Sequence, residues 1–278
     1  MTESTTILAA FVKYLLQEER EGSTIAKYVR DVRFFLEWLE GRECSKENAI
    51  VWKEHLSARN YSPSSINAML AAVNKLFRFL GVPEARVKYL RVQRKLFRQH
   101  ERELTKEEYL RLTETAHSLG RERLGLLMEA ICATGIRVSE VKYLTVEAAR
   151  EGRADISLKG KVRTILLPGK LCRKLLKYAR KQKIASGEVF RTRSGKSLSR
   201  RQIWAEMKSL CRRAGVAGSK VFPHNLRHLF ARTFYRVYKD VARLADILGH
   251  SSIETTRIYL VSSGAEHARQ LERLRLIC

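Results

Sequence analysis

The sequence predicts a mainly α-helical protein of the α+β class, with two domains and one small antiparallel β-sheet. Apolar residues recur at helical spacing through most of the 278-residue chain. One short segment, residues 154–168, alternates in the manner of β-strands instead. Charge is unevenly divided: residues 1–83 hold 11 Lys or Arg and 10 Asp or Glu, whereas residues 84–278 hold 43 and 19. These observations separate a nearly neutral helical domain from a strongly basic one.

Residues 1–83 are predicted to form a bundle of four short helices joined by tight turns. Turn residues divide the region into helices that end near Gly22, Gly41, Ala58 and Gly81. The fourth helix begins at Ser62, with Pro63 in the first turn, where the missing N–H of proline costs nothing. Short helices with brief connections favour a small independent bundle.

A basic connector, residues 84–103, is predicted to lead into a second domain, residues 104–278. This domain opens with a capping-box pattern, in which Thr105 and Glu108 satisfy each other's backbone N–H groups. The alternating segment around residues 159–161 predicts a β-hairpin. Helices are predicted over residues 105–117, 121–134, 137–147, 169–184, 199–214, 225–238, 240–248, 252–260 and 264–275.

The charge balance predicts a polyanionic partner. Lys and Arg number 54 against 29 Asp and Glu, a formal net charge of +25, and the excess concentrates in residues 84–100 and 159–220. A solvated basic surface and an anionic membrane surface are the alternatives that composition leaves open. No apolar run reaches the roughly 20 residues of a membrane span, and the first residues do not resemble a secretory signal. Five scattered cysteines indicate free thiols, so we expect a cytoplasmic protein without disulfides or a zinc site.

Three segments of the second domain carry residues capable of chemistry: A-T-G-I-R-V-S-E at 133–140, H-N-L-R-H at 224–228 and L-G-H-S-S-I-E-T-T-R-I-Y at 248–259. Taken singly, each has a simpler interpretation. Arg137 suits a surface ion pair with Glu140, and Tyr259 suits a half-buried aromatic. The two histidines of H-N-L-R-H stand four apart, but the glutamate of the zinc motif H-E-x-x-H is missing and an arginine stands beside them.

Together, these residues suit the cleavage of a phosphodiester. A tyrosine hydroxyl, with a pKa near 10, is a poor nucleophile at neutral pH. Two arginines would grip the non-bridging oxygens and stabilise the charge of the transition state. A histidine would take the phenolic proton, and a lysine would protonate the departing 5′-oxygen. The resulting phosphotyrosine keeps the energy of the broken bond for rejoining, so no metal, ATP or other cofactor is expected.

The three segments match A-T-G-[IL]-R-[VI]-S-E, H-x-L-R-H and L-G-H-x(4)-T-T-x-x-Y, and through them the chain resembles the tyrosine recombinase/integrase family, its Xer-like members in particular. The spacing agrees as well: 90 residues separate Arg137 from Arg227, 23 lead on to His250, and nine more reach Tyr259. The resemblance covers the whole chain. It implies that the first domain is a SAM-like, core-binding DNA-binding domain and that the second is catalytic.

The resemblance also implies a role for each matching residue. Tyr259 would be the nucleophile, with Arg137 and Arg227 on the scissile phosphate. His224 would be the general base or a phosphate donor, and His250 would hydrogen-bond the phosphate.

Further residues would complete the site that the resemblance implies. Glu140 would orient the first arginine, and His228 would pack beside the catalytic groups. Family members commonly carry G-K-G-x-K-x-R in a hairpin, whereas this chain has the shorter L-K-G-K-V-R at 158–163. Lys159 is expected to be the leaving-group acid, with Lys161 as its competitor. Contact of both lysines with DNA phosphate is the alternative.

Other residues are expected to position the DNA. The connector suits the backbone of a duplex held between two domains, and the helix from Ser199 is the candidate for a major groove. The expected contacts are Ser64, Ser65, Asn67 and Lys75 in the first domain, Arg91, Arg94, Lys95 and Arg98 in the connector, and Lys161, Arg163, Arg200, Arg201, Trp204 and Lys208 in the second.

The resemblance implies double-stranded DNA with inverted-repeat half-sites as substrate, and no membrane. A homodimer would bind one site, and a homotetramer in synapsis would exchange strands through a Holliday junction. Residues 264–275 carry an apolar stripe at helical spacing and are expected to dock on a neighbouring protomer, with docking on their own domain as the alternative. A type IB topoisomerase and a non-catalytic DNA-binding regulator are the other functions considered.

Overall fold

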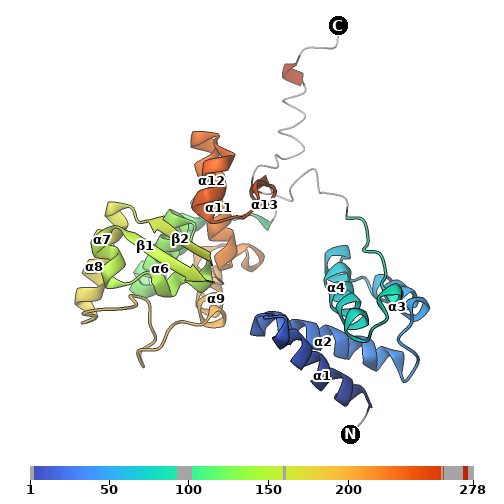
Figure 1. Ribbon diagram of the computed structural model, residues 1–278. Coiled ribbons are helices and arrows are strands. Elements are labelled where there is room, and N and C mark those ends of the chain that lie inside the picture. Colours follow the sequence, from blue (N-terminus) through green and yellow to red (C-terminus); the bar gives the residue numbers. More distant parts are fainter. Residues whose placement is uncertain (1–2, 93–101, 159–160, 258, 260–271, 275–278) are drawn as a thin grey trace. The chain divides into compact units, whose positions relative to one another are not determined.

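The computed structural model describes residues 3–92, 102–158, 161–257, 259 and 272–274 (Figure 1). The chain divides into two compact units, Met1–Arg94 and Lys95–Cys278. Helices dominate both, and a single two-stranded antiparallel sheet is present among the described residues. This architecture agrees with the predicted α+β class.

The described residues of the first unit form four α-helices and one 3₁₀ turn. Ser45 and Ser62 accept the hydrogen bonds that begin the third and fourth helices, and Pro63 is the first residue of the fourth, as predicted. The second helix begins at Gly22, where the first helix was predicted to end. The elements are α1 Glu3–Gln17, α2 Gly22–Leu39, α3 Lys46–Ala58, α4 Pro63–Phe79 and η1 Pro83–Ala85.

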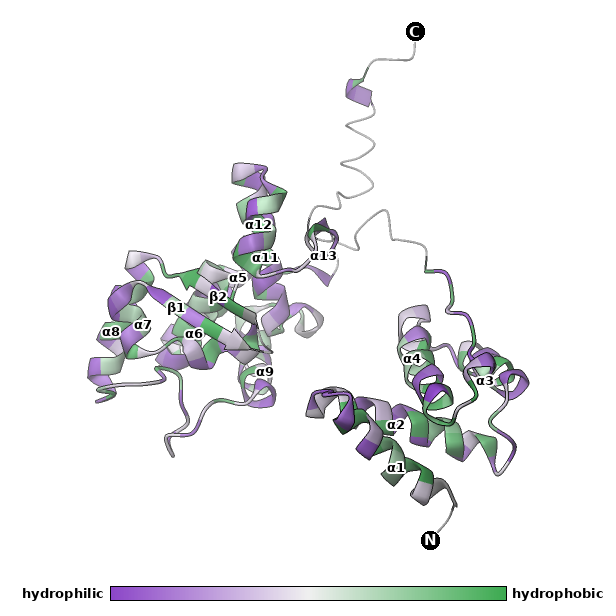
Figure 2. Cartoon of the chain, in the orientation of Figure 1, coloured by the Kyte–Doolittle hydropathy of each residue, from purple (hydrophilic) through white to green (hydrophobic). Residues whose placement is uncertain are grey.

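Aromatic rings form the centre of this bundle. The ring of Phe35 on α2 lies 4.9 Å from that of Trp52 on α3 and 6.0 Å from that of Phe77 on α4. All three side chains are fully buried. In Figure 2 the helices of this unit carry both hydrophobic and hydrophilic stretches, as expected for helices that bury one face.

Two asparagines on α4 hold the segment that follows the bundle. The side-chain amide of Asn74 donates to the carbonyl of Val87 and accepts from the N–H of the same residue, at 3.0 and 2.9 Å. Asn67 makes the same pair of bonds with the backbone of Leu90, at 2.9 and 2.8 Å. Each amide therefore acts like a strand neighbour, and the segment to Leu90 belongs to the first unit.

The second unit surrounds a central helix, α6, whose side chains are buried nearly all round. This element confirms the helix predicted over residues 121–134. No helix among the described residues has the length and apolarity to span a membrane. The elements are α5 Lys106–Ser118, α6 Glu122–Thr134, η3 Val138–Tyr143, α7 Val146–Glu151, β1 Arg153–Leu158, β2 Lys161–Leu166, α8 Gly169–Lys181, α9 Arg200–Lys208, α10 Cys211–Ala214, η4 Gly218–Lys220, α11 Pro223–Tyr238, α12 Val241–Leu248 and α13 Ile253–Arg257.

The hairpin is present as predicted, with Arg153 opposite Leu166 and Leu158 opposite Lys161. Two helix predictions are wrong. Residues 137–147 form a 3₁₀ segment and the start of a separate helix, because Thr145 caps α7. Residues 199–214 form two helices, since α9 ends at Lys208 and α10 begins at Cys211. The predicted helix over 264–275 lies almost wholly outside the described residues.

Candidate functional site

The end of α6 begins the site. Gly135 terminates this helix with a φ of +65°, and a Cβ there would lie 2.5 Å from Cδ1 of Phe230. Both the positive φ and this close approach require glycine. The turn directs the following residues into η3 and leaves the carbonyl of Gly135 free to accept a hydrogen bond from α11.

Arg137 is held on two sides. Its Nη1 donates to Oε1 of Glu140 at 2.9 Å, and its Nη2 donates to the carbonyl of Gly249 at 3.1 Å. Glu140 is 2% exposed and also accepts from the backbone N–H of Arg137. Burial raises the pKa of Glu140, but that N–H and the charges of Arg163 and Arg137 outweigh it, so the net pKa is lowered. The carboxylate stays ionised and orients the guanidinium, whose side chain keeps 38% of its surface exposed.

Arg227 on α11 is 1% exposed and is bonded to three other segments. Its Nη1 donates to the carbonyl of Gly135 at 2.5 Å. Its Nη2 donates to the carbonyl of Leu248 at 2.7 Å and lies 3.0 Å from Nε2 of His250. Burial and then the charge of Arg137 lower the pKa of Arg227 to about 10, so it remains a cation at neutral pH.

His250 is a neutral imidazole with an assignable tautomer. Because Nη2 of Arg227 can only donate, Nε2 of His250 must accept. The proton therefore sits on Nδ1, which lies 2.8 Å from Oγ1 of the fully buried Thr256. Burial, followed by the charges of Arg227 and Arg137, lowers the pKa of His250 to about 4. Thr256 was missed by the sequence reasoning, although its place in L-G-H-x(4)-T-T was a usable signal.

Tyr259 lies among these groups and is 4% exposed. Its ring is 5.9 Å from that of His250, nearly parallel, and 4.8 Å from that of His228, nearly perpendicular. The phenol lies close enough to Arg227 to raise the pKa of that arginine, against the larger lowering by burial. Tyr259 and Arg227, 32 positions apart in sequence, are therefore neighbours in the site.

His224 stands at the start of α11 with an exposed side chain. Its ring centroid is 4.4 Å from that of His228. Desolvation, followed by the charges of Arg227 and Arg137, lowers its pKa below the usual histidine value. A neutral imidazole at pH 7 is able to accept a proton.

A cavity of about 620 Å³ opens beside Arg137 and His224. Its far wall belongs to the beginning of α9, where Trp204 is 47% exposed. The lining residues are Ile136, Arg137, Val138, Ser139, Arg200, Arg201, Trp204, Phe222, Pro223, His224 and Arg227. The cavity thus joins the predicted phosphate-binding groups to three of the predicted DNA contacts.

Two predicted DNA contacts of the first unit are engaged within the protein. The ammonium of Lys75 is bonded to Glu18 and its side chain is 10% exposed. Both polar atoms of the Asn67 amide are used on the backbone of Leu90. Both contacts stay predictions, and the partners that hold each side chain in this structure are distant in sequence.

Arg163 and Lys208 are also engaged within the protein. Arg163 donates to Glu140 and to the carbonyl of Ile247, and its side chain is 15% exposed. Lys208 donates to the carbonyl of Gly218, and its ammonium lies 5.5 Å from the centroid of the Trp204 ring. The guanidinium of Arg163 and the ammonium of Lys208 are therefore both bonded within the protein.

The remaining predicted contacts stay predictions. Ser64 is exposed at the start of α4, Ser65 is partly so, and Arg91 is exposed. Lys161 is the first residue of β2. The predicted residues that lie outside the described part of the chain are Arg94, Lys95, Arg98 and Lys159.

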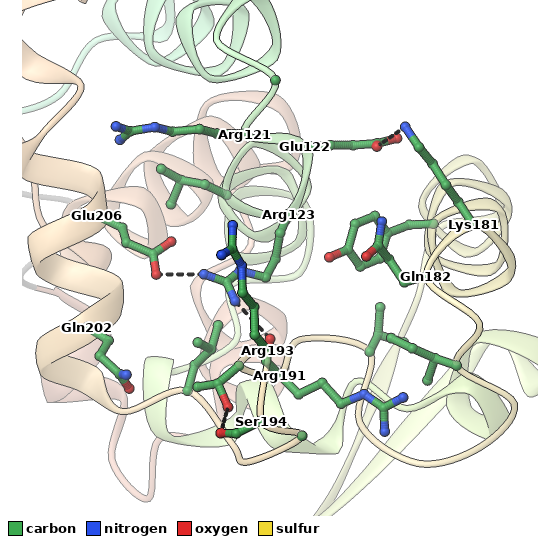
Figure 3. A pocket seen from close by; sticks show the side chains of 18 of the residues that line it. Arg121, Glu122, Arg123, Lys181, Gln182, Arg191, Arg193, Ser194, Gln202 and Glu206 are labelled. Atoms are coloured by element: carbon green, nitrogen blue, oxygen red, sulfur yellow. Dashed lines mark hydrogen bonds and ion pairs between the residues drawn. The ribbon is translucent and has the colours of Figure 1, made fainter.

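A larger cavity of about 1320 Å³ lies away from this site. It is lined by the beginning of α6, the end of α8 and one side of α9 (Figure 3). Arg123 is paired with Glu206 at 2.7 Å, and Lys181 with Glu122 at 2.6 Å. The groups described above gather at the opposite end of α6, about 20 Å along a 13-residue helix. This cavity is therefore separate from the candidate site.

Sequence families cover both units. Residues 102–266 match the phage integrase family, and residues 8–81 match the phage integrase N-terminal SAM-like domain. The chain is 31% identical to the tyrosine recombinase XerA of Pyrococcus furiosus over 281 aligned residues, which cover 98% of this chain and 94% of the relative.

Solved structures share the fold. A crystal structure of the XerH site-specific recombinase bound to palindromic difH substrate, in a post-cleavage complex, gives a TM-score of 0.69 at 21% identity and covers 91% of this chain and 79% of that one. A lambda integrase tetramer bound to a Holliday junction gives 0.71 at 17% identity, with coverage of 92% and 76%. At these identities the likeness shows a common fold.

Proposed function

The chain belongs to the phage integrase family and is a tyrosine recombinase, and we propose that it cuts and rejoins DNA through a covalent bond between Tyr259 and a DNA 3′-phosphate. The observation that carries this proposal is the packing of the buried Tyr259 ring on His250, which is itself bonded to the buried guanidinium of Arg227. A nucleophile and a fixed cation at one place are what in-line attack on a phosphodiester requires.

In the proposed step, the oxygen of Tyr259 forms a bond to phosphorus while the bond from phosphorus to the 5′-oxygen breaks. The phenolic proton passes to His224, whose lowered pKa keeps it neutral and able to accept. The departing 5′-oxygen takes a proton from Lys159, with Lys161 as the alternative source. Reversal with a new 5′-hydroxyl rejoins the strand, so no external energy source enters.

The two arginines are proposed to share the phosphate unequally. Arg137 lines the cavity and keeps 38% of its side chain exposed, so it meets the phosphate first. Arg227 is already bonded to two carbonyls and to His250. Both nitrogens of His250 are thereby occupied, by Arg227 and Thr256. We therefore assign His250 to fixing Arg227, and its expected bond to the phosphate would first require release of Nε2.

We also propose the assembly implied by the family. A dimer would bind two inverted half-sites, and two such dimers would form a tetramer that exchanges strands through a Holliday junction. The similarity to a recombinase bound to a palindromic substrate and to an integrase tetramer on a Holliday junction supports this arrangement. The net charge of +25 supports duplex DNA as the partner.

A nicked suicide duplex tests the chemistry. The site is first selected from a pool of random duplexes by binding to this protein. Wild-type protein is expected to form a covalent adduct that resists denaturing electrophoresis, and Tyr259→Phe is expected to form none while binding the duplex equally well. An adduct that persists in Tyr259→Phe contradicts the proposal. Relaxation of plasmids regardless of site would assign the topoisomerase reaction instead.

A further inference from the structure

An arginine stands on the inner face of the hairpin. In β2, Val162 and Leu166 are 75% and 78% exposed, whereas Ile165 is 3% exposed, as alternation along a strand requires. Arg163 shares the inner face with Ile165, and its side chain is 15% exposed. Desolvating a guanidinium is costly unless its donors find acceptors, so this residue has a structural task.

The guanidinium of Arg163 joins three segments of the second unit. Its Nη2 donates to Oε2 of Glu140 in η3 at 2.5 Å, and its Nη1 donates to the carbonyl of Ile247 in α12 at 2.9 Å. The side chain also lies against the turn after α12, because a Cβ on Gly249 would meet Cδ of Arg163 at 2.5 Å. Arg163 therefore connects the hairpin to η3 and to the turn before His250.

Arg163 uses the same groups that hold Arg137. Glu140 accepts from Arg163 through Oε2 and from the Arg137 guanidinium through Oε1. The turn that packs on Arg163 at Gly249 also gives its carbonyl to Arg137. The hairpin is thus tied to the acceptors that orient a predicted phosphate-binding group.

We infer that Arg163 is a positioning residue that fixes hairpin β1–β2 relative to Arg137 and His250 and thereby supports proton transfer to the leaving group. The inference rests on the proposed function, in which a lysine near the hairpin end supplies the proton. A two-stranded hairpin has little stability of its own. Residue 161, where β2 begins, is only two positions from Arg163, so a shift of this arginine passes directly to the hairpin end.

The leaving group offers a way to isolate this effect. When sulfur replaces the bridging 5′-oxygen of the scissile phosphate, the bond from phosphorus to sulfur breaks and a thiolate leaves. A thiol has a pKa near 8.5, so the thiolate departs without a proton. A variant that misplaces only the acid regains activity on this substrate, whereas one that disturbs phosphate binding does not.

The experiment compares Arg163→Met and Arg163→Lys on suicide duplexes with oxygen or sulfur at that position. Lysine keeps the charge but lacks the planar fork that reaches Glu140 and Ile247 together. On the oxygen substrate, both variants are expected to cleave about 10²-fold more slowly, the size of effect that a small misplacement produces. On the sulfur substrate, both are expected to cleave within a few-fold of wild type.

Arg153→Met is the matched control. This arginine lies in β1 of the same hairpin, but its side chain is 58% exposed and pairs with the exposed Glu151. It is expected to leave both cleavage rates unchanged. Affinity for the intact duplex reports whether each variant is folded, and Arg163→Lys, which retains the buried charge, keeps the test open if Arg163→Met does not fold.

Two results overturn the inference: an equal slowing of Arg163→Lys on both substrates, or no slowing on either. The first assigns Arg163 to phosphate binding or to the fold alone, and the second removes any role. Failure of the proposed function looks different, because wild-type protein would then give no Tyr259-dependent adduct with either substrate.

Discussion

The two units of this protein are organised around different interiors. In the first, the centre is three aromatic side chains, with Phe35 in edge-to-face contact with Trp52 and with Phe77. In the second, the core of apolar residues surrounds α6, but the site at its end is built on buried ions, with Glu140 at 2% and Arg227 at 1% exposure. Aromatic packing depends on volume and shape, whereas buried ions depend on each hydrogen bond.

Because the interiors differ, substitutions in the first unit should act mainly on folding stability, and substitutions in the site should act mainly on DNA cleavage. A change in the aromatic centre of the first unit should lower the free energy of unfolding and leave the reacting groups alone. A change among the site ions should remove cleavage even where the fold survives. The following experiments would break or sharpen that distinction.

The largest effect is expected for Arg227→Ala. Loss of a fixed cation beside the phosphate should slow cleavage by about 10³-fold or more. Because the guanidinium is 1% exposed, duplex affinity should change little. Single-turnover cleavage and a binding titration measure the two quantities, with the exposed Arg180→Ala as control. Loss of affinity in step with cleavage would contradict the separation.

Trp52→Ala should destabilise the first unit by about 3–5 kcal/mol, since it empties a fully buried aromatic site. Denaturant unfolding gives the free energy. At a temperature where the variant is folded, the adduct formed per molecule of bound duplex should equal that of wild type. Trp38→Ala, a partly buried neighbour of Phe35, should cost less.

The units should also lose stability in different pH ranges. The pKa of His250 is lowered from 6.5 to about 4, so its contribution is complete above pH 6.5 and is lost as the pH falls toward 4. In the first unit, bonds from Lys75 and Tyr14 lower the pKa of Glu18 from 4.5 to about 2, so that contribution is lost only as the pH falls from 4.5 toward 2.

Hydrogen exchange of segments of α11 and α2, corrected for the intrinsic pH dependence, measures both ranges. Protection in α11 should decrease between pH 6.5 and 4 while that in α2 persists. His250→Gln should flatten the pH dependence of protection in α11. The pKa of His224 is also lowered, and His224→Asn should flatten this dependence less. The same pH dependence of protection in both helices would contradict the prediction that the two units lose stability in different pH ranges.

The smallest effect is expected at a helix cap. Oγ of Ser45 accepts from the N–H of Asn48 at 3.2 Å, so Ser45→Ala should cost about 1 kcal/mol of stability. Ser57→Ala lies in the same helix, at an exposed position near its end, and should cost less. Paired denaturant curves compare the two variants, and equal losses would contradict the capping argument.

The sequence predicted much of this fold because local rules governed it. The Ser62 cap with Pro63, the Thr105 capping box and the hairpin were all predicted from spacing of a few residues. The helix over 137–147 was wrongly predicted, since residues 138–143 form a 3₁₀ segment and Thr145 caps a separate helix.

The candidate site was predicted less evenly. Motif spacing identified groups that the structure brings together, such as Arg227, His250 and Tyr259. It did not reveal the intramolecular partners of side chains whose neighbours are remote in sequence. Lys75 meets Glu18 across 57 positions, and Arg163 meets Ile247 across 84. Periodicity carries no information on such pairings, because a buried cation and a DNA-binding cation look alike in sequence.

The two asparagines on α4 determine where the first unit can be exchanged when chimeras are made with related proteins. Asn67 and Asn74 bind the backbone of Leu90 and Val87 as a neighbouring strand would. A chimera that exchanges the first unit at Pro83 would separate both side-chain amides from the backbone segment that they bind. A chimera joined after Leu90 would transfer the bundle together with the backbone segment that these asparagines bind. Chimeras of this family should therefore be joined after this segment.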